Sequence, residues 1–148
     1  MKNFILAVLL ALMVSSIANA DGPVSSKEGL AIQGYDVVAY FTESKPVEGS
    51  SQFTSEWNGA VWQFSSDENL EQFKNNPEKY APLFGGFCTL TVAHGALIPG
   101  NPQAWTIKNE RLALFFHQPA RETWLMNPDP LLQRATTNWN AAKTPPAR

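Results

Sequence analysis

The sequence predicts an α+β fold, a small single domain in which helices pack against two β-hairpins. Two observations predict the hairpins: aromatic-rich arms flank Asn58-Gly59, and a second pair of apolar arms turns near residues 108–110. A third observation predicts the helices, because segments with helical spacing of apolar residues follow each hairpin. Mixed hairpins and helices of this kind belong to the α+β class.

The first twenty residues have the pattern of a secretory signal peptide. Lys2 provides a positive charge, residues 4–14 form an apolar run, and Ala18-Asn19-Ala20 matches a small-x-small cleavage site. The apolar run is short for a membrane span; an uncleaved signal anchor is the alternative. We therefore expect residues 1–20 to be removed, a periplasmic or secreted protein, and no membrane span in the mature chain.

The next segments divide into a leader and the start of the domain. We expect a leader over residues 21–33, loose in its first part, and a domain over residues 34–118. The first hairpin is predicted in "SQFTSEWNGAVWQFSS", because Asn-Gly is the strongest short-range signal for a tight type I′ turn. A helix over "DENLEQFKNN" follows, capped by Ser66 or Asp67.

Proline and glycine then mark the boundaries of the remaining elements. Pro77 opens a second helical turn that Gly85-Gly86 ends. A second hairpin is predicted in "AWTIKNERLALFF". A C-terminal helical extension is expected over residues 119–142, with one helix starting at Pro119 and another in "LLQRATTNWNAA", where Trp139 is spaced for burial. Residues 143–148 are expected to form a flexible tail.

Composition excludes several classes of function. The formal net charge is −2, and the charges are scattered without a basic block, which makes nucleic acid a poor partner. A single cysteine cannot form an internal disulfide, so packing must supply the stability. Five Trp, nine Phe and three Tyr residues supply much of the expected core, with an aromatic carbohydrate platform as the alternative use.

The order of the motifs resembles the YHS domain family, in particular its exported single-domain members. The motifs are "GYDVVAYF", then "EWNGAVWQFSSDENLEQFKNNPEKYAPLFGGFC", and finally "AWTI" and "LALFF". The resemblance runs from about Gly34 to Phe116. It implies a TRASH-like core derived from the treble clef, as in the metal modules of copper-, mercury- and lead-handling proteins.

The resemblance also implies where a metal site of that kind would lie. The cysteines of the related metal modules lie at positions that correspond in this chain to Ala39, Ser65 and Asn69. None of these three residues is a soft metal ligand. A tetrahedral thiolate site needs several sulfur atoms. We therefore expect the fold of these modules without their thiolate site.

Three other residues are candidate metal ligands: Cys88, His94 and His117. Cys88 follows Gly85-Gly86, and the hypothesis is a polarised thiolate in a cleft; the alternative is a small buried apolar residue. His94 is six residues further on, which gives no automatic chelation on a helix or a strand, so a surface histidine is its alternative. His117 either starts a helix or supplies a second imidazole to the cleft.

Four residues are candidate ligand-binding residues: Tyr35, Asp36, Tyr40 and Trp105. The first three lie in "GYDVVAYF", where hydrogen-bonding side chains in an apolar context suit a pocket wall. Asp36 is equally suited to cap a short turn. Trp105 lies in "AWTI", which we expect beside this segment.

The leading hypothesis is an exported YHS-domain binding protein with copper as its cofactor, because imidazole and thiolate suit copper. The first alternative is a non-metal module that binds a small ligand or a partner protein and has a structural cysteine. The weaker alternative is a cysteine-dependent enzyme, which needs a histidine beside the sulfur. Conventional catalytic and nucleotide-binding motifs are absent from the sequence, which argues against an enzyme.

Overall fold

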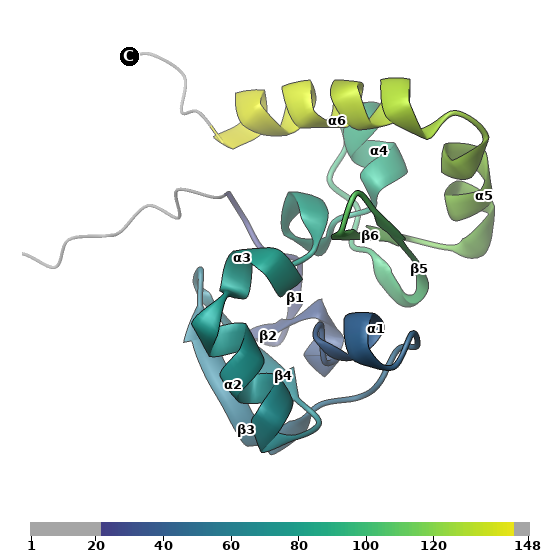
Figure 1. The fold of residues 1–148 in the computed structure, drawn as a ribbon. Coiled ribbons are helices and arrows are strands. Elements are labelled where there is room, and N and C mark those ends of the chain that lie inside the picture. The colour runs from purple at the N-terminus through teal and green to yellow at the C-terminus, as the bar shows by residue number, and fades with distance from the viewer. Residues whose placement is uncertain (1–21, 144–148) are drawn as a thin grey trace, which may run out of the picture.

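The computed structural model describes residues 22–143 as two β-sheets with helices packed around them (Figure 1). The predicted signal peptide and nearly all of the predicted tail lie outside these residues. The strands are β1 Ser26–Lys27, β2 Leu30–Ala31, β3 Ser50–Trp57, β4 Ala60–Phe64, β5 Asn101–Lys108 and β6 Arg111–Phe115. The helices are η1 Ile32–Gly34, α1 Ala39–Thr42, α2 Asp67–Asn75, α3 Pro77–Tyr80, η2 Leu83–Gly86, α4 Thr89–Ala93, α5 Gln118–Met126 and α6 Pro128–Lys143. The predicted α+β class is confirmed.

The first sheet has the strand order β1-β2-β4-β3. Its β3–β4 hairpin turns at Asn58-Gly59, where both residues have positive φ (49° and 77°), as a type I′ turn requires. The pairing of β2 with β4 is parallel and aligns Leu30 with Val61. The hairpin predicted from the sequence is therefore confirmed.

The expected leader segment differs from the structure. Ser26–Lys27 and Leu30–Ala31 form strands β1 and β2 of the sheet, and Ala31 and Ile32 are buried. The described residues before them also make specific contacts, because the Ser25 N–H donates to the Gly85 carbonyl at 2.8 Å. Gly22 packs so closely on Trp139 and Lys143 that a Cβ there would lie 2.8 Å from both side chains. Residues 22–33 thus belong to the fold.

Helix α2 covers the β3–β4 hairpin. Ser66 is its N-cap, and its Oγ accepts from the Asn69 N–H at 3.1 Å. Phe73 on the inner face of α2 stacks on Trp62 (5.2 Å between ring centroids) and contacts Phe64 (4.9 Å). The predicted helix is confirmed, and these rings form the centre of the first core.

The second sheet is the β5–β6 hairpin, which turns at Asn109-Glu110 with positive φ at both residues (52° and 61°). Its strand β6 is buried on both faces: Leu112 and Leu114 pack towards the first sheet, and Ala113 and Phe115 pack towards α5. The second predicted hairpin is confirmed, and it joins the two halves of the molecule.

Helices α4, α5 and α6 cover the far side of this hairpin, with α6 lying across α4 at the end opposite the first sheet (Figure 1). Helix α6 begins at Pro128, three residues before the predicted start at Leu131, because Pro128 and Pro130 fit the first turn of a helix. Helix α4 was not expected; its buried residues Val92 and Ala93 pack against Ala135 and Trp139.

The buried apolar side chains form three clusters. The sheet cluster consists of Ala31, Ile32, Val37, Val38, Tyr40, Ala60, Trp62, Phe64, Phe73, Tyr80, Ala81, Leu112 and Leu114. The hairpin cluster consists of Cys88, Ala104, Ala113, Phe115, Ala120 and Trp124. The helix cluster consists of Phe84, Val92, Ala93, Ala135 and Trp139. Among residues 22–143, no helix is both long and apolar enough to cross a membrane.

Candidate functional site

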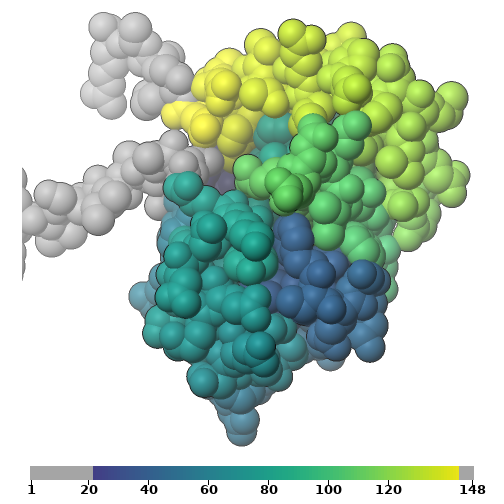
Figure 2. Space-filling model, viewed as in Figure 1, coloured from purple at the N-terminus to yellow at the C-terminus, as the bar shows by residue number. Residues whose placement is uncertain are grey.

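A pocket of about 330 Å³ lies where the sheet cluster meets the helix cluster. We call it the aromatic pocket. Its lining comes from both ends of the described chain and from the middle: Val24, Trp57, Asn58, Trp62, Glu78, Ala81, Pro82, Leu83, Phe84, Gly85, Arg111, Thr136, Trp139 and Lys143. Figure 2 shows the surfaces that meet in this part of the molecule, with α2 and α3 in teal, the β5–β6 hairpin in green and α6 in yellow.

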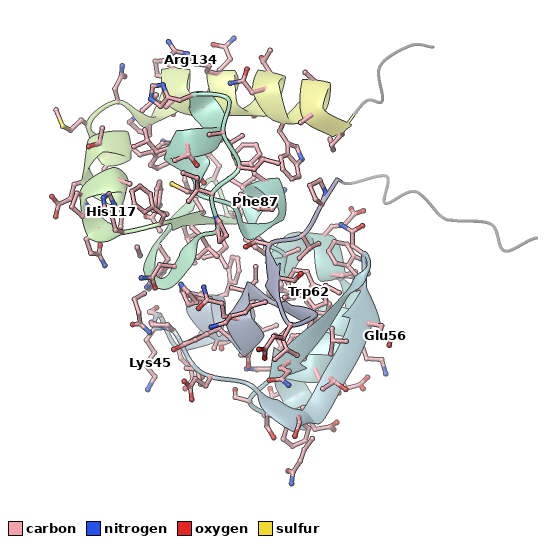
Figure 3. All side chains as sticks on the ribbon, turned by 180° about the vertical axis from the view of Figure 1, so that it is seen from behind. Lys45, Glu56, Trp62, Phe87, His117 and Arg134 are labelled. Atoms are coloured by element: carbon pink, nitrogen blue, oxygen red, sulfur yellow. The ribbon has the colours of Figure 1, made fainter. Side chains whose placement is uncertain are left out.

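Three tryptophans form the walls of the aromatic pocket. Trp57 ends β3, Trp62 lies in the middle of the paired strand β4, and their rings meet edge to face, 5.6 Å between ring centroids. The Trp62 indole N–H donates to the Trp57 carbonyl at 2.9 Å, which fixes the ring at its place in the wall (Figure 3). Trp139 on α6 provides the opposite wall, and its ring contacts that of Phe84 with 5.9 Å between the ring centroids. The pocket is therefore built by rings from separate elements.

The turn in η2 shapes one side of the pocket. Phe84 and Gly85 have positive φ (54° and 62°), and η2 is kinked at these residues. A Cβ at residue 85 would collide with the Pro23 carbonyl oxygen and approach the Trp139 ring at 3.3 Å. Glycine at this position is therefore needed for the N-terminal segment and α6 to close on the turn.

Arg111, the first residue of β6, brings a charged group to the pocket lining. Its Nη2 donates to the Ala81 carbonyl at 3.4 Å, which is a long hydrogen bond. Its Nε is buried and has no hydrogen-bond partner among the described residues. Lys143 and Glu78 also line the pocket. The lining thus combines apolar rings with one incompletely paired guanidinium.

The predicted ligand-binding residues lie together, at a different place from the aromatic pocket. Tyr40 and Trp105 meet edge to face at 5.1 Å, which brings "GYDVVAYF" and "AWTI" side by side as expected. The Tyr40 hydroxyl is buried and donates to the Pro102 carbonyl at 2.7 Å. Burial, followed by the charges of Tyr35 and Asp36, raises the pKa of Tyr40 far above its ordinary value. Tyr40 therefore serves as a neutral, packed hydrogen-bond donor.

Tyr35 and Trp105 keep partial exposure at the surface. The Tyr35 hydroxyl accepts from the Gln103 side-chain amide at 3.3 Å. Trp105 lines a shallow hollow of about 360 Å³ together with Gln103, Thr106, Gln118 and Arg121. The Arg121 guanidinium in that hollow is already paired, because its Nε donates to the Trp105 carbonyl at 2.6 Å.

Asp36 is fully buried and holds three segments together. Its Oδ1 accepts from the N–H groups of Val38 and Ala39 at 2.9 and 3.2 Å, which holds the turn that leads into α1. Its Oδ2 accepts from the Ser65 N–H, the Ser65 hydroxyl and the Asn69 amide at 2.9, 2.7 and 2.7 Å. All of these contacts are structural, as the capping alternative predicted.

The Asp36 network also occupies the positions that the family resemblance associated with cysteines. Ser65 and Asn69 point at one carboxylate oxygen of Asp36, and the Ala39 N–H points at the other. A carboxylate with this many donors is already satisfied. The expected loss of the thiolate site thus has a structural counterpart, since hydrogen bonds link the same positions here.

The three candidate metal ligands lie at three different helix ends. Cys88 is the N-cap of α4, has 0% exposed surface and packs in the hairpin cluster. His94 is the exposed C-cap of α4. His117 is the exposed N-cap of α5: its Nδ1 accepts from the Ala120 N–H at 3.1 Å, and its ring stacks on Phe116 (Figure 3).

The donor chemistry does not fit a copper or zinc centre in the described part of the chain. No group of three His, Cys, Asp or Glu side chains in residues 22–143 is arranged to hold a metal ion. Cys88 has no exposed surface through which metal or substrate could reach its sulfur, and His117 already uses Nδ1 as a helix cap. A buried thiol with apolar neighbours is typical of a packing residue.

Sequence reasoning did not single out the aromatic pocket. Its lining spans residues 24–143, so no local spacing reports it. The signals available were the surplus of tryptophan in a small domain and the placement of Trp57 and Trp62 on either side of a tight turn. Trp139 is buried, as its spacing predicts, with 6% of its surface exposed.

The structure is a small α+β domain with a pocket lined by aromatic rings. A family model described as the YHS domain matches residues 38–83, from the start of α1 to the start of η2. Residues 38–83 therefore form a YHS domain, which supports the resemblance that the motifs indicated. The match includes Trp57 and Trp62 and ends before Cys88. Neither a curated protein nor a solved structure matches the chain.

Proposed function

We propose that the chain is an exported YHS-domain binding protein that takes a small organic molecule into the aromatic pocket. The observation that carries the proposal is the convergence of Trp57, Trp62 and Trp139 around one cavity. The third ring comes from a helix beyond the matched YHS segment, so α6 completes a site that the YHS segment begins.

The size and lining of the pocket support this function. A volume of about 330 Å³ lies at the lower end of the range for small-molecule sites. Such sites are mostly apolar, with a few polar groups that orient the ligand. Flat indole rings provide large contact areas that lose little side-chain entropy on binding. A flat or compact apolar molecule fits these walls best.

The YHS domain links the chain to a metal-related function, and copper at Cys88, His94 and His117 stays a prediction. The positions of these three residues favour an organic ligand over copper, because the Cys88 sulfur is inaccessible and the two histidines lie at separate helix ends. Export likewise remains a proposal that rests on the N-terminal pattern. Mass spectrometry of periplasmic protein should give Asp21 as the first residue, and an intact Met1 would contradict it.

A matched pair of variants on α6 tests the pocket. Thr136 lines it and Thr137 does not, yet both are exposed and both hydroxyls donate to the carbonyl four residues earlier, at 2.8 and 3.1 Å. Thr136→Phe adds a ring that fills the pocket mouth, whereas Thr137→Phe makes the same change beside it. A library of small aromatic and aliphatic compounds would be screened by protein NMR shift changes.

Compounds that bind the wild type should shift resonances of Trp57, Trp62 and Trp139. Their affinity should fall about tenfold or more in Thr136→Phe and stay unchanged in Thr137→Phe, because a filled pocket loses the contact area of the ligand. An equal loss of affinity in both variants would contradict the proposal, as would NMR shift changes confined to residues outside the pocket.

A further inference from the structure

Arg111 carries more hydrogen-bonding capacity than the described chain uses. An arginine side chain presents five N–H donors and keeps its charge at any physiological pH. Here one long hydrogen bond goes from Nη2 to the Ala81 carbonyl, and the buried Nε has no partner. Leaving a charged donor buried and unpaired is costly, so a structure normally supplies an acceptor.

Neighbouring acids do not supply that acceptor within the described residues. The ion pairs found there join Lys74 with Glu71 and Lys108 with Asp129, so Arg111 takes part in neither. Glu78 lines the same pocket, but it is exposed and makes no ion pair with Arg111. Lys143 adds a second positive charge to the lining. The pocket lining therefore combines aromatic rings with two cationic side chains and one exposed acid.

We infer that the molecule bound in the aromatic pocket is a small carboxylate with an apolar body. The inference rests on the proposed function and adds the chemical class of the ligand. The planar guanidinium matches the geometry of a carboxylate, which it binds through two parallel hydrogen bonds. The apolar body of the ligand lies between the indole rings while its carboxylate meets the Nη groups of Arg111, because the Nε is buried.

The first test uses the wild-type protein and pairs of probes that differ only in charge. Phenylacetate is compared with phenylacetamide, and indole-3-acetate with indole-3-acetamide, by calorimetry and NMR. Each carboxylate should bind about ten- to a hundredfold more tightly than its amide, the range expected for hydrogen bonds to a charged group. Added salt should weaken only the carboxylates.

The outcomes separate this inference from the proposed function. Amides that bind in the pocket as tightly as carboxylates overturn the carboxylate inference and leave the organic-ligand site in place. Binding that Thr136→Phe does not affect overturns the site itself, and the inference with it.

The second test compares Arg111→Gln with Arg134→Gln. Arg134 is exposed on the outer face of α6, away from Trp62, so its variant makes the same change in net charge outside the pocket (Figure 3). Arg111→Gln should remove the preference for carboxylate over amide, and Arg134→Gln should keep it. Circular dichroism and the melting temperature confirm that each variant is folded.

Arg111→Lys covers the case in which the glutamine variant does not fold. Lysine keeps the charge and loses the planar fork, so carboxylate affinity should fall several-fold while amide affinity stays the same. In addition, a saturating carboxylate probe should raise the melting temperature of the wild type more than that of either Arg111 variant. An unchanged carboxylate preference in the Arg111 variants that fold would overturn the inference.

Discussion

At the scale of single residues, Cys88 shows how burial decides chemistry. The thiol lies in the hairpin cluster with Phe115 and Trp124, and its backbone N–H donates to the Ile98 carbonyl at 2.7 Å. The adjacent Thr89 hydroxyl is also buried and lacks a partner among the described residues. The surroundings of Cys88 therefore already contain one unpaired polar atom, and a second one would lower the free energy of unfolding further.

We predict that thiol reagents label Cys88 only as fast as the folded protein opens, because the sulfur has no exposed surface. Cys88→Ser should lower the free energy of unfolding by about 1–3 kcal/mol, since a hydroxyl is buried without a partner. Cys88→Ala is the control for lost packing. The labelling rate is measured with and without one equivalent of copper, and denaturant unfolding measures the loss of stability. Fast labelling that copper slows would support the copper centre instead.

Tyr40 provides a pH-dependent contribution to stability. Burial first, and then the nearby Tyr35 and Asp36, raise the pKa of Tyr40 above its usual value of 10.0. The native state thus holds this proton more tightly than the unfolded state does. The resulting stability is complete below pH 10 and is lost as the pH rises above it.

We therefore predict that denaturant midpoints fall steeply above about pH 10 in the wild type. In Tyr40→Phe this part of the decline should disappear. The variant should also lose about 1 kcal/mol at neutral pH, because the Pro102 carbonyl loses its donor. Parallel pH slopes for the two proteins would show that Tyr40 titrates normally.

At the scale of elements, the two hairpins form turns with positive φ at both turn residues but use different residues there. Both turns place asparagine first with positive φ, and they differ at the second position, which is Gly59 in one and Glu110 in the other. Glycine adopts positive φ without steric cost, whereas an L-residue with a Cβ pays about 1–2 kcal/mol. The β5–β6 turn is therefore strained where the β3–β4 turn is relaxed.

Exchanging the second residues tests this comparison. Gly59→Glu should lower the free energy of unfolding by about 1–2 kcal/mol. Glu110→Gly should raise it by about 0.5 kcal/mol, because relief of the backbone strain exceeds the added entropy of the unfolded chain. Urea unfolding of both variants measures the difference; a loss of stability in Glu110→Gly would mean that the Glu110 side chain makes a favourable contact.

The elements that the sequence predicted are those with local signals. The Asn58-Gly59 turn, the Ser66 cap and the prolines that begin α3 and α5 each depend on a few adjacent residues. Strands β1 and β2 have two residues each, too few to show an alternation of apolar and polar residues. The sequence therefore predicts a leader segment there instead of strands. Helix α4 contains β-branched residues that favour strands, and it is helical because it packs on α6.

At the scale of the whole molecule, the aromatic pocket depends on the packing of distant segments against one another. Trp57 and Trp62 come from the first sheet, Arg111 from the second, and Trp139 from the last helix, so the aromatic pocket forms only when all three meet. The sequence contained each residue but no spacing that joins them. The candidates it did highlight, Asp36 and Cys88, proved to be buried groups that hold the framework.

The contact of Gly22 with Lys143 makes the fold suitable for circular permutation. These residues already touch beside the pocket, so a short glycine-serine bridge can connect them without crossing the core. New ends can be opened at Gly95, which is exposed and has open space where a Cβ would lie. In such a permutant, only the bridge, Gly22 and Pro23 would separate Lys143 from Val24, and both residues line the pocket.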